Sequence, residues 1–399
     1  MPRLEPFAAL RYRESIYLDD VTAPPYDVID DEERAALAAR SPYNAVRLEL
    51  PVDDDGSDRY QVAARLLSTW IDEGVLVGDE SPSFYLYRMG FTDEHGRARQ
   101  TSGVIGALEL SAPAEGEVLP HEETTARAKS DRLALLEATS CNLSPIWCLS
   151  PAEGLARLAE PTGPPLARCT DATGTHHRLW QVSAPGSIEA ISSLVASAPV
   201  IIADGHHRYQ TALTLRQQRQ RAGSAPGGHD LVMALVVELT ESELAVRAIH
   251  RLLTGLPPEV DVISAWQPLF RADRAPGDPA ELLGLLVPAA ALGLVLPDGS
   301  SWLLCPRPGT FPDDLPDLDA ARLEHARRLL PPHEVTYHHD AAAALAGVGR
   351  GVGAAAALLR PATVAQIAAT AELRERMPAK TTYFHPKPRT GMVFRSIER

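Results

Sequence analysis

The chain has 399 residues, which is enough for two or three domains, and its hydrophobic content of 45% can supply well-packed cores. Its 52 acidic residues outnumber 38 basic ones, and a net charge of −14 argues against non-specific binding of nucleic acid, which needs a basic surface. The longest apolar stretch, Leu286–Leu296, contains Pro288 and is too short to span a membrane. With no signal-peptide pattern apparent, we expect a cytoplasmic protein without a membrane partner.

Hydrophobic periodicity predicts a mixed α/β fold in which short strands and amphipathic helices follow one another. Early in the chain, Pro24 and Pro25 form a rigid turn just before Tyr26 and Asp27. This turn could hold Asp27 in place for proton transfer, and an ordinary structural turn is the alternative. The elements expected around it are strands over Ile16–Ala23 and Asn44–Leu50 and helices over Asp30–Arg40 and Arg59–Glu73.

Two β-hairpins are expected in the next part of the chain. The adjacent His176 and His177 fall in the second hairpin, where alternation sends their side chains to opposite faces, so we interpret them as structural residues. The expected elements are the hairpins 83–92/97–110 and 166–170/176–182, a helix from about Ser130 to Asn142, a strand over Ile146–Leu149 and a helix over Ser187–Ser197.

A polar segment precedes the helix that is expected from Ser130. It brings Glu122, Lys129 and Arg132 together with a histidine and an aspartate within a dozen residues. Such a set offers groups for proton transfer and for charge stabilisation. A solvated helix start is the alternative interpretation.

The stretch Val200–Leu215 predicts a strand, a tight turn and the N-terminus of a helix. Asp204 can cap the helix, Gly205 lets the backbone approach a ligand, and Arg208 adds a fork of donors for phosphate or carboxylate. Free backbone N–H groups and the positive end of the helix dipole favour an anion at such a junction. We therefore predict a phosphate-binding turn, although an ordinary strand–helix junction carries similar residues. The adjacent His206 and His207 are poor joint ligands for a metal ion, so no metal ligands are assigned.

The remaining sequence continues the mixed pattern and ends in a motif-like segment. We divide the chain into three regions, residues 1–150, 151–256 and 257–399, the last beginning with a Pro- and Gly-rich peripheral part over 257–316. Further expected elements are strands over Asp230–Leu239 and Leu244–Leu252, central in a sheet, helices over Asp317–Leu330 and Val364–Arg376, and a closing segment, Met377–Phe394, that docks against the body of the protein.

Lysine is rare in this chain. Only Lys129, Lys380 and Lys387 are present among the 38 basic residues, so arginine has replaced lysine almost everywhere. A compact ammonium and a planar guanidinium differ physically, and the three lysines are therefore candidates for positions that a guanidinium would not serve. Chance survival is the alternative.

Five motifs in order resemble a bacterial and archaeal family catalogued as domain of unknown function 1015. They are an APPYDV turn (Ala23–Val28), HEET followed by KSDR (His121–Arg132), NLSPI (Asn142–Ile146), DGHHRYQTAL (Asp204–Leu213) and MPAKTTYFHPK (Met377–Lys387). The resemblance covers nearly the whole chain. It departs from the family at Thr381, where serine is usual, and at His385, where an aromatic residue is common.

The DGHHR turn resembles, more distantly, the phosphate-binding turn of the ParB/sulfiredoxin superfamily, which includes free-serine kinases with a DGHHR motif. This resemblance implies a ParB/sulfiredoxin-like core with additional mixed-sheet regions. It also implies that Gly205, His206, His207 and Arg208 contact the phosphates of a nucleotide.

The resulting hypothesis is a kinase that transfers phosphate from ATP or ADP, with CTP also possible and Mg²⁺ expected, to a small-molecule hydroxyl such as that of serine. Glu122 or Asp27 would accept the hydroxyl proton, and Lys129 or Lys380 would neutralise developing charge. The expected nucleotide-binding set also contains Asp204 and Thr381. The alternatives are a ParB-like nucleotide switch and a regulatory protein without turnover.

Overall fold

The computed structural model describes residues 1–54, 56–94, 96–112, 116–120 and 129–398. These residues form two compact units. The first contains the described residues up to 120, residues 129–245 and residues 386–398, and the second contains residues 246–385. The units divide the chain at different places from the three regions expected from the sequence, and those regions stay a prediction. The fold is mixed α/β, as predicted.

A nine-stranded mixed sheet forms the centre of the first unit, in the order β6-β11-β8-β12-β5-β4-β10-β9, with β1 on β5. Both predicted hairpins are confirmed as β4–β5 and β9–β10. Gly103 allows close strand packing, since a Cβ there would lie 2.6 Å from the Val236 carbonyl oxygen. The strands are β1 (Leu4–Glu5), β4 (Phe84–Thr92), β5 (Ala98–Glu109), β6 (Val118–Pro120), β8 (Ile146–Ser150), β9 (Ala167–Thr170), β10 (His176–Val182), β11 (Val200–Asp204) and β12 (Leu231–Glu238).

The helices over residues 129–139, 155–158, 185–195 and 206–221 pack on this sheet and share its core, to which Leu155, Ile191 and Tyr209 contribute. Asp30 is the N-cap of α2, accepting the N–H of Glu33 at 2.8 Å, and the two longer helices predicted before residue 80 are confirmed. The helices are α2 (Asp31–Arg40), α4 (Arg59–Asp72), α5 (Lys129–Thr139), α6 (Leu155–Leu158), α7 (Pro185–Val195) and α8 (His206–Arg221), with the 3-10 helices η1 (Tyr26–Val28) and η4 (Gly228–Asp230).

Two strands predicted near the N-terminus are wrong. The segment expected as a strand over 16–23 contains the short helix α1 (Leu18–Val21), and the one expected over 44–50 contains α3 (Val46–Glu49). Asn44 explains the second case, because its side-chain oxygen accepts the N–H of Val46 at 3.0 Å and starts a helical turn. Its side-chain nitrogen also donates to the carbonyl of Asp20, so a tertiary contact fixes the conformation.

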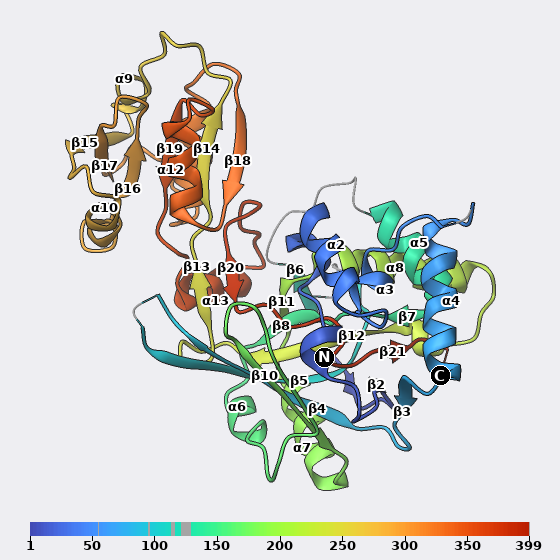
Figure 1. Ribbon diagram of the computed structural model, residues 1–399. Helices are drawn as coiled ribbons and strands as arrows, with labels where there is room; N and C mark the ends of the chain where they lie inside the picture. Colours follow the sequence, from blue (N-terminus) through green and yellow to red (C-terminus); the bar gives the residue numbers. More distant parts are fainter. Residues whose placement is uncertain (55, 95, 113–115, 121–128, 399) are drawn as a thin grey trace. The chain divides into compact units, whose positions relative to one another are not determined.

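The C-terminal segment completes the first unit. Strand β21 (Arg395–Ser396) pairs with β7 (Cys141–Asn142), and Figure 1 shows this red segment beside β7. Phe394 is fully buried and its backbone exchanges two hydrogen bonds of 2.9 Å with Leu10 in β2 (Leu10–Tyr12), which pairs with β3 (Leu76–Gly78). The predicted docking is therefore confirmed for residues 386–394.

The second unit is built on a six-stranded antiparallel sheet in the order β15-β17-β16-β19-β14-β18. The single strand predicted over 244–252 is wrong, because the chain leaves β13 at Arg247 and enters this second sheet at His250. The residues 257–316 contribute strands to the same sheet. The elements are β13 (Ala245–Arg247), β14 (His250–Thr254), α9 (Val262–Trp266), β15 (Phe270–Arg274), α10 (Pro279–Leu286), β16 (Leu292–Val295), β17 (Ser301–Pro306), α11 (Asp319–Arg327), β18 (Glu334–His338), α12 (Ala341–Gly349), β19 (Ala355–Leu358), α13 (Val364–Glu372) and β20 (Tyr383–His385).

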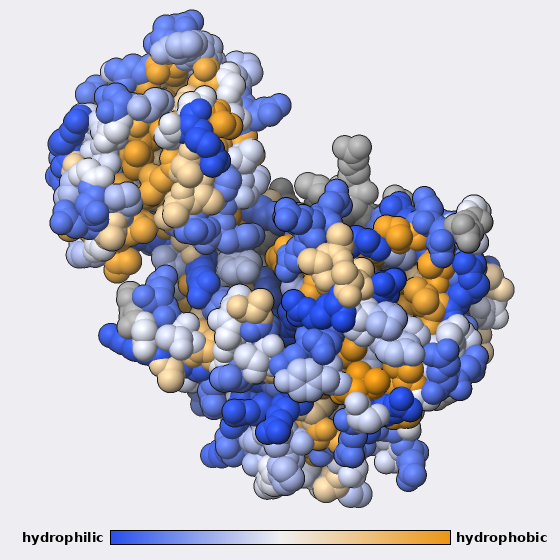
Figure 2. Space-filling view, in the orientation of Figure 1, coloured by the Kyte–Doolittle hydropathy of each residue, from blue (hydrophilic) through white to orange (hydrophobic). Residues whose placement is uncertain are grey.

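Hydrophobic and hydrophilic side chains are interspersed on the face of each unit shown in Figure 2. Among the residues that the structure describes, no helix has the length and apolar character needed to cross a membrane.

Candidate functional site

The predicted strand, turn and helix are present at residues 200–221 in the first unit. Strand β11 ends at Asp204, Gly205 adopts the left-handed conformation with φ of 87°, and α8 begins at His206. Two features require glycine at position 205. One is the positive φ, and the other is the lack of space, because a Cβ there would lie 3.0 Å from Cγ2 of Ile146 and 3.1 Å from Cζ of Arg208. Gly205 is the N-cap residue and has no side chain to cap the helix, and the first turn of this 16-residue helix contains no acidic residue. The positive end of the helix dipole is therefore not neutralised by its own first turn.

Asp204 does not cap the helix, so that prediction is wrong. Its Oδ1 lies 2.8 Å from Nζ of Lys387 and its Oδ2 lies 3.1 Å from Nη2 of Arg208. Burial alone would raise the pKa of Asp204, but the charges of Lys387 and Arg208 outweigh it and hold this pKa well below its usual range. The carboxylate is thus a charged anchor between two cations rather than a helix cap.

Arg208 is held mainly by the protein itself. Its Nη1 donates to Oγ of Ser144 at 3.2 Å and to the carbonyl oxygen of Pro145, while Nη2 binds Asp204. Burial lowers the pKa of Arg208, yet Asp204 and other nearby anionic groups raise it overall. The buried Nε has no hydrogen-bond partner among the described residues. The N–H group at Nε is therefore left to meet a ligand in this conformation.

A buried carboxylate that sequence reasoning missed, that of Glu49, interacts electrostatically with Arg208. Glu49 is 3% exposed, and its Oε1 accepts a hydrogen bond of 3.2 Å from Ser144 and lies 3.6 Å from Nη1 of Arg132. Burial raises the pKa of Glu49, against the opposing charges of Arg132 and Arg208. A signal was present in the sequence, because the charged Glu49 stands between two apolar residues, Leu48 and Leu50.

A small cavity of about 50 Å³ lies against this network. Its walls include Glu49, Arg208 and Thr211, and in each of them one buried polar atom has no hydrogen-bond partner among the described residues: Oε2, Nε and Oγ1, respectively. Unpaired buried polar groups cost free energy, so a polar guest is favoured in this cavity.

The structure describes only some of the side chains that were predicted to accept a proton or to neutralise charge. Asp27 lies exposed in η1, close enough for its charge to act on Arg208. The adjacent Tyr26 packs its ring 4.4 Å from the guanidinium carbon of Arg132. Lys129 is the first residue of α5 and its side chain is outside the described part, as is the whole of Glu122.

His206 and His207 are half-buried in the first turn of α8. Lys380 and Thr381 belong to the second unit, where the carbonyl of Lys380 accepts a hydrogen bond of 2.7 Å from Arg251 and the hydroxyl of Thr381 donates to Pro378. Their role in nucleotide binding stays a prediction. No group of three or more histidine, cysteine, aspartate or glutamate residues among the described residues is arranged to hold a metal ion.

Several solved structures match the chain at low sequence identity, among them the following three. A conserved hypothetical protein from Pyrococcus furiosus has a TM-score of 0.37 and 13% identity, over 72% of this chain and 91% of its own. A free serine kinase in complex with AMP has a TM-score of 0.40 and 12% identity, over 74% and 92%. SbnI with a C-terminal truncation, from Staphylococcus aureus, has a TM-score of 0.40 and 10% identity, over 72% and 85%.

No curated protein sequence matches the chain. A family model described as "Protein of unknown function (DUF1015)" matches residues 4–321, which is most of the chain and includes the Asp204–Arg208 turn. The protein therefore belongs to this family, as its ordered motifs predicted.

Proposed function

We propose that the protein is a nucleotide-dependent phosphotransferase that phosphorylates a small-molecule hydroxyl, such as that of serine or another hydroxy acid. The observation that carries the proposal is the N-terminus of α8, which begins at left-handed Gly205 with no acidic residue in its first turn. Such a helix start suits the phosphates of ATP or ADP, and those of CTP are also possible.

The charge around Asp204 supports an anionic ligand. One carboxylate is shared by two cations, Arg208 and Lys387, so two positively charged groups lie beside the helix start. The side chains of these three residues are between 11% and 16% exposed, so solvent screens them little. The unpaired Nε of Arg208 is a donor that a phosphate oxygen would satisfy.

In the proposed reaction, the acceptor oxygen forms a bond to the terminal phosphorus of the nucleotide. The bond from that phosphorus to its bridging oxygen breaks, which yields the phosphorylated acceptor and a nucleotide shortened by one phosphate. The hydroxyl proton goes to a carboxylate, for which Glu122 and Asp27 are the candidates, and Lys129 or Lys380 would neutralise charge. Mg²⁺ would enter with the nucleotide, bound mainly by phosphate oxygens and water.

Two glycine variants test the proposal. Nucleotide binding with Mg²⁺ is measured by calorimetry for the wild type, Gly205→Ala and Gly223→Ala, using ATP, ADP and CTP. Both glycines have positive φ, but a Cβ at Gly223 meets nothing within 4 Å. We expect binding to be lost in Gly205→Ala and kept in Gly223→Ala, and phosphate transfer to serine or another hydroxy acid in the wild type. The absence of nucleotide binding in the wild type, or equal binding by both variants, would overturn the site. Binding without transfer would favour the switch or regulatory alternative.

A further inference from the structure

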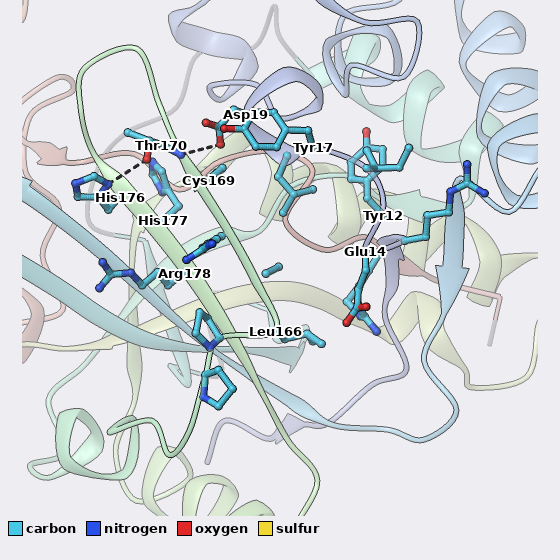
Figure 3. A pocket seen from close by; sticks show the side chains of 18 residues that line it. Tyr12, Glu14, Tyr17, Asp19, Leu166, Cys169, Thr170, His176, His177 and Arg178 are labelled. Carbon is cyan, nitrogen blue, oxygen red and sulfur yellow. Dashed lines mark hydrogen bonds between the residues drawn. The ribbon is translucent and has the colours of Figure 1, made fainter.

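A second cavity, of about 870 Å³, lies in the first unit, and its lining includes none of Asp204, Arg208 and Lys387. It is bounded by the β9–β10 hairpin on one side and by the segment that follows β2 on the other. In Figure 3, Thr170, His176 and Arg178 lie on the hairpin side and Tyr12 and Glu14 lie opposite them. A volume of this size is in the range of pockets that enclose small organic molecules, roughly 300–1,000 Å³.

Two arginines on the hairpin face each other without a countercharge. Arg168 and Arg178 are direct cross-strand partners, and both line the cavity. Like charges in this position repel, because side chains directly opposite lie on the same face about 5 Å apart at Cβ. Neither side chain forms an ion pair or hydrogen bond with any residue in the described ranges. Arg88, the cross-strand partner of Arg178 on β4, is by contrast neutralised by an ion pair, with Glu160 at 2.9 Å.

The two acidic residues that line the cavity, Asp19 and Glu14, form no ion pair with Arg168 or Arg178 among the described residues. Asp19 accepts the backbone N–H of Thr170 at 3.0 Å and the hydroxyl of Tyr17, and Glu14 is exposed. The opposite wall adds a further exposed arginine, Arg13, which also lacks an ion pair among the described residues. Arg11, by contrast, is bound to Asp79 at 2.8 Å. Three arginines without an ion pair among the described residues thus line one cavity of a chain whose net charge is −14.

Apolar side chains form another part of the wall. Pro164, Pro165 and Leu166 precede β9, and Ile16 and Leu18 face the cavity from the N-terminal segment. We propose that this cavity binds an organic anion, whose phosphate or carboxylate group lies between Arg168 and Arg178 and whose apolar body packs on this wall. A planar guanidinium group suits both ligands, because it can donate two parallel hydrogen bonds to the oxygens of a phosphate or of a carboxylate.

The test uses calorimetry with phenyl phosphate, phenylacetate and inorganic phosphate as probes. Wild type is compared with Arg168→Gln/Arg178→Gln and with Arg221→Gln, which removes an exposed arginine at the far end of α8. We expect at least one aromatic probe to bind the wild type more tightly than inorganic phosphate. Its affinity should fall about tenfold or more in the double variant and remain unchanged in Arg221→Gln. The melting temperature of the double variant should not fall, since the substitutions relieve repulsion.

The outcome with each probe identifies the ligand. Preference for phenyl phosphate indicates a phosphate ester, and preference for phenylacetate indicates a carboxylic acid. Binding of neither aromatic probe, equal binding of inorganic phosphate, or unchanged affinity in the double variant would overturn the proposal. Gly205→Ala separates this site from the phosphate turn, because aromatic-probe binding should persist in that variant whether or not the nucleotide proposal holds.

Discussion

The ammonium group of Lys387 lies 2.8 Å from the carboxylate of Asp204, although 183 positions separate the two residues in the sequence. Both side chains are less than one-fifth exposed. This ion pair fixes the C-terminal segment to the end of β11, directly beside the N-terminus of α8. The position and charge of the candidate phosphate turn therefore depend on a residue far away in the chain.

Replacing Lys387 with methionine should destabilise the protein at neutral pH by roughly 3 kcal/mol, because a buried carboxylate loses one of its two cations. The native-state pKa of Asp204 is lowered, so its contribution to stability is present above about pH 4 and is lost as pH falls through the native-state pKa. The difference between wild type and variant should therefore shrink between pH 7 and pH 3 in urea unfolding. Arg221→Met is the control, and an equal loss at both pH values would contradict this account.

Glu49→Gln should have the opposite pH dependence. Burial raises the native-state pKa of Glu49, so the native state binds more protons than the unfolded state and wild-type stability falls as pH rises through this range. Glutamine cannot titrate, and the stability difference should move in favour of the variant between about pH 4 and pH 7. Urea unfolding across this range measures it. A difference that moves toward the wild type would show that Arg132 and Arg208 dominate the energetics of Glu49.

His177→Phe should cost roughly 2–4 kcal/mol at pH 7, because Tyr87 and Asp171 each lose a buried hydrogen bond. The hydroxyl of Tyr87 accepts the N–H of Arg389, so it donates to Nδ1 of His177 at 2.7 Å, and Nε2 then donates to Asp171 at 3.2 Å. Thermal unfolding is the measurement.

The same variant tests the charge of His177. Burial lowers the pKa of this imidazole, so wild-type stability falls as pH drops below about 6.5, and the gap to His177→Phe should narrow between pH 7 and pH 5. His176 is exposed on the other face of β10, and His176→Phe should change stability by less than about 0.5 kcal/mol. Similar losses of stability in both variants would contradict a stabilising role for the hydrogen bonds that join Tyr87, His177 and Asp171.

Phe394→Ala should destabilise the first unit by about 3–5 kcal/mol, since it empties a fully buried site against Tyr12. Phe270, equally buried in the core of the second unit, provides the matched variant Phe270→Ala. Hydrogen exchange should increase in β2, β7 and β8 for the first variant and in β14 to β17 for the second. Increased exchange throughout both units in either variant would mean that they do not unfold separately.

Local sequence signals predicted the elements that local contacts determine. The helix expected over Asp30–Arg40 is α2, which starts one residue later because Asp30 is its N-cap. The hairpins follow from alternating residues around Asp93–Gly96 and Asp171–Thr175. His176 and His177 have opposite exposures, as strand alternation requires. The strand, turn and helix around Gly205 were predicted for the same reason, because a glycine between a short apolar run and a helical period marks a tight turn, where its access to positive φ is needed.

The parts that sequence reasoning missed depend on distant residues. Asp204 has the composition of a helix cap, and only the approach of Lys387 and Arg208 converts it into an ion-pair anchor. Glu49 lies in a segment rich in apolar residues that suggested a strand, whereas the Asn44 side chain and contacts with Arg132 and Ser144 stabilise a helical turn. Lys387, one of only three lysines in the chain, forms a largely buried ion pair with Asp204, and the proposal that a guanidinium would not serve there stays a prediction.

The pairing of β21 with β7 has a consequence for biosynthesis. Translation proceeds from the N-terminus, so residues 246–385 emerge from the ribosome before Lys387, Phe394 and Arg395 do. The second unit can close its antiparallel sheet while the first still lacks its last strand and the cation beside Asp204. We therefore expect the second unit to complete its fold before the first unit does. The candidate phosphate turn acquires the charge of Lys387 only when synthesis has passed that residue.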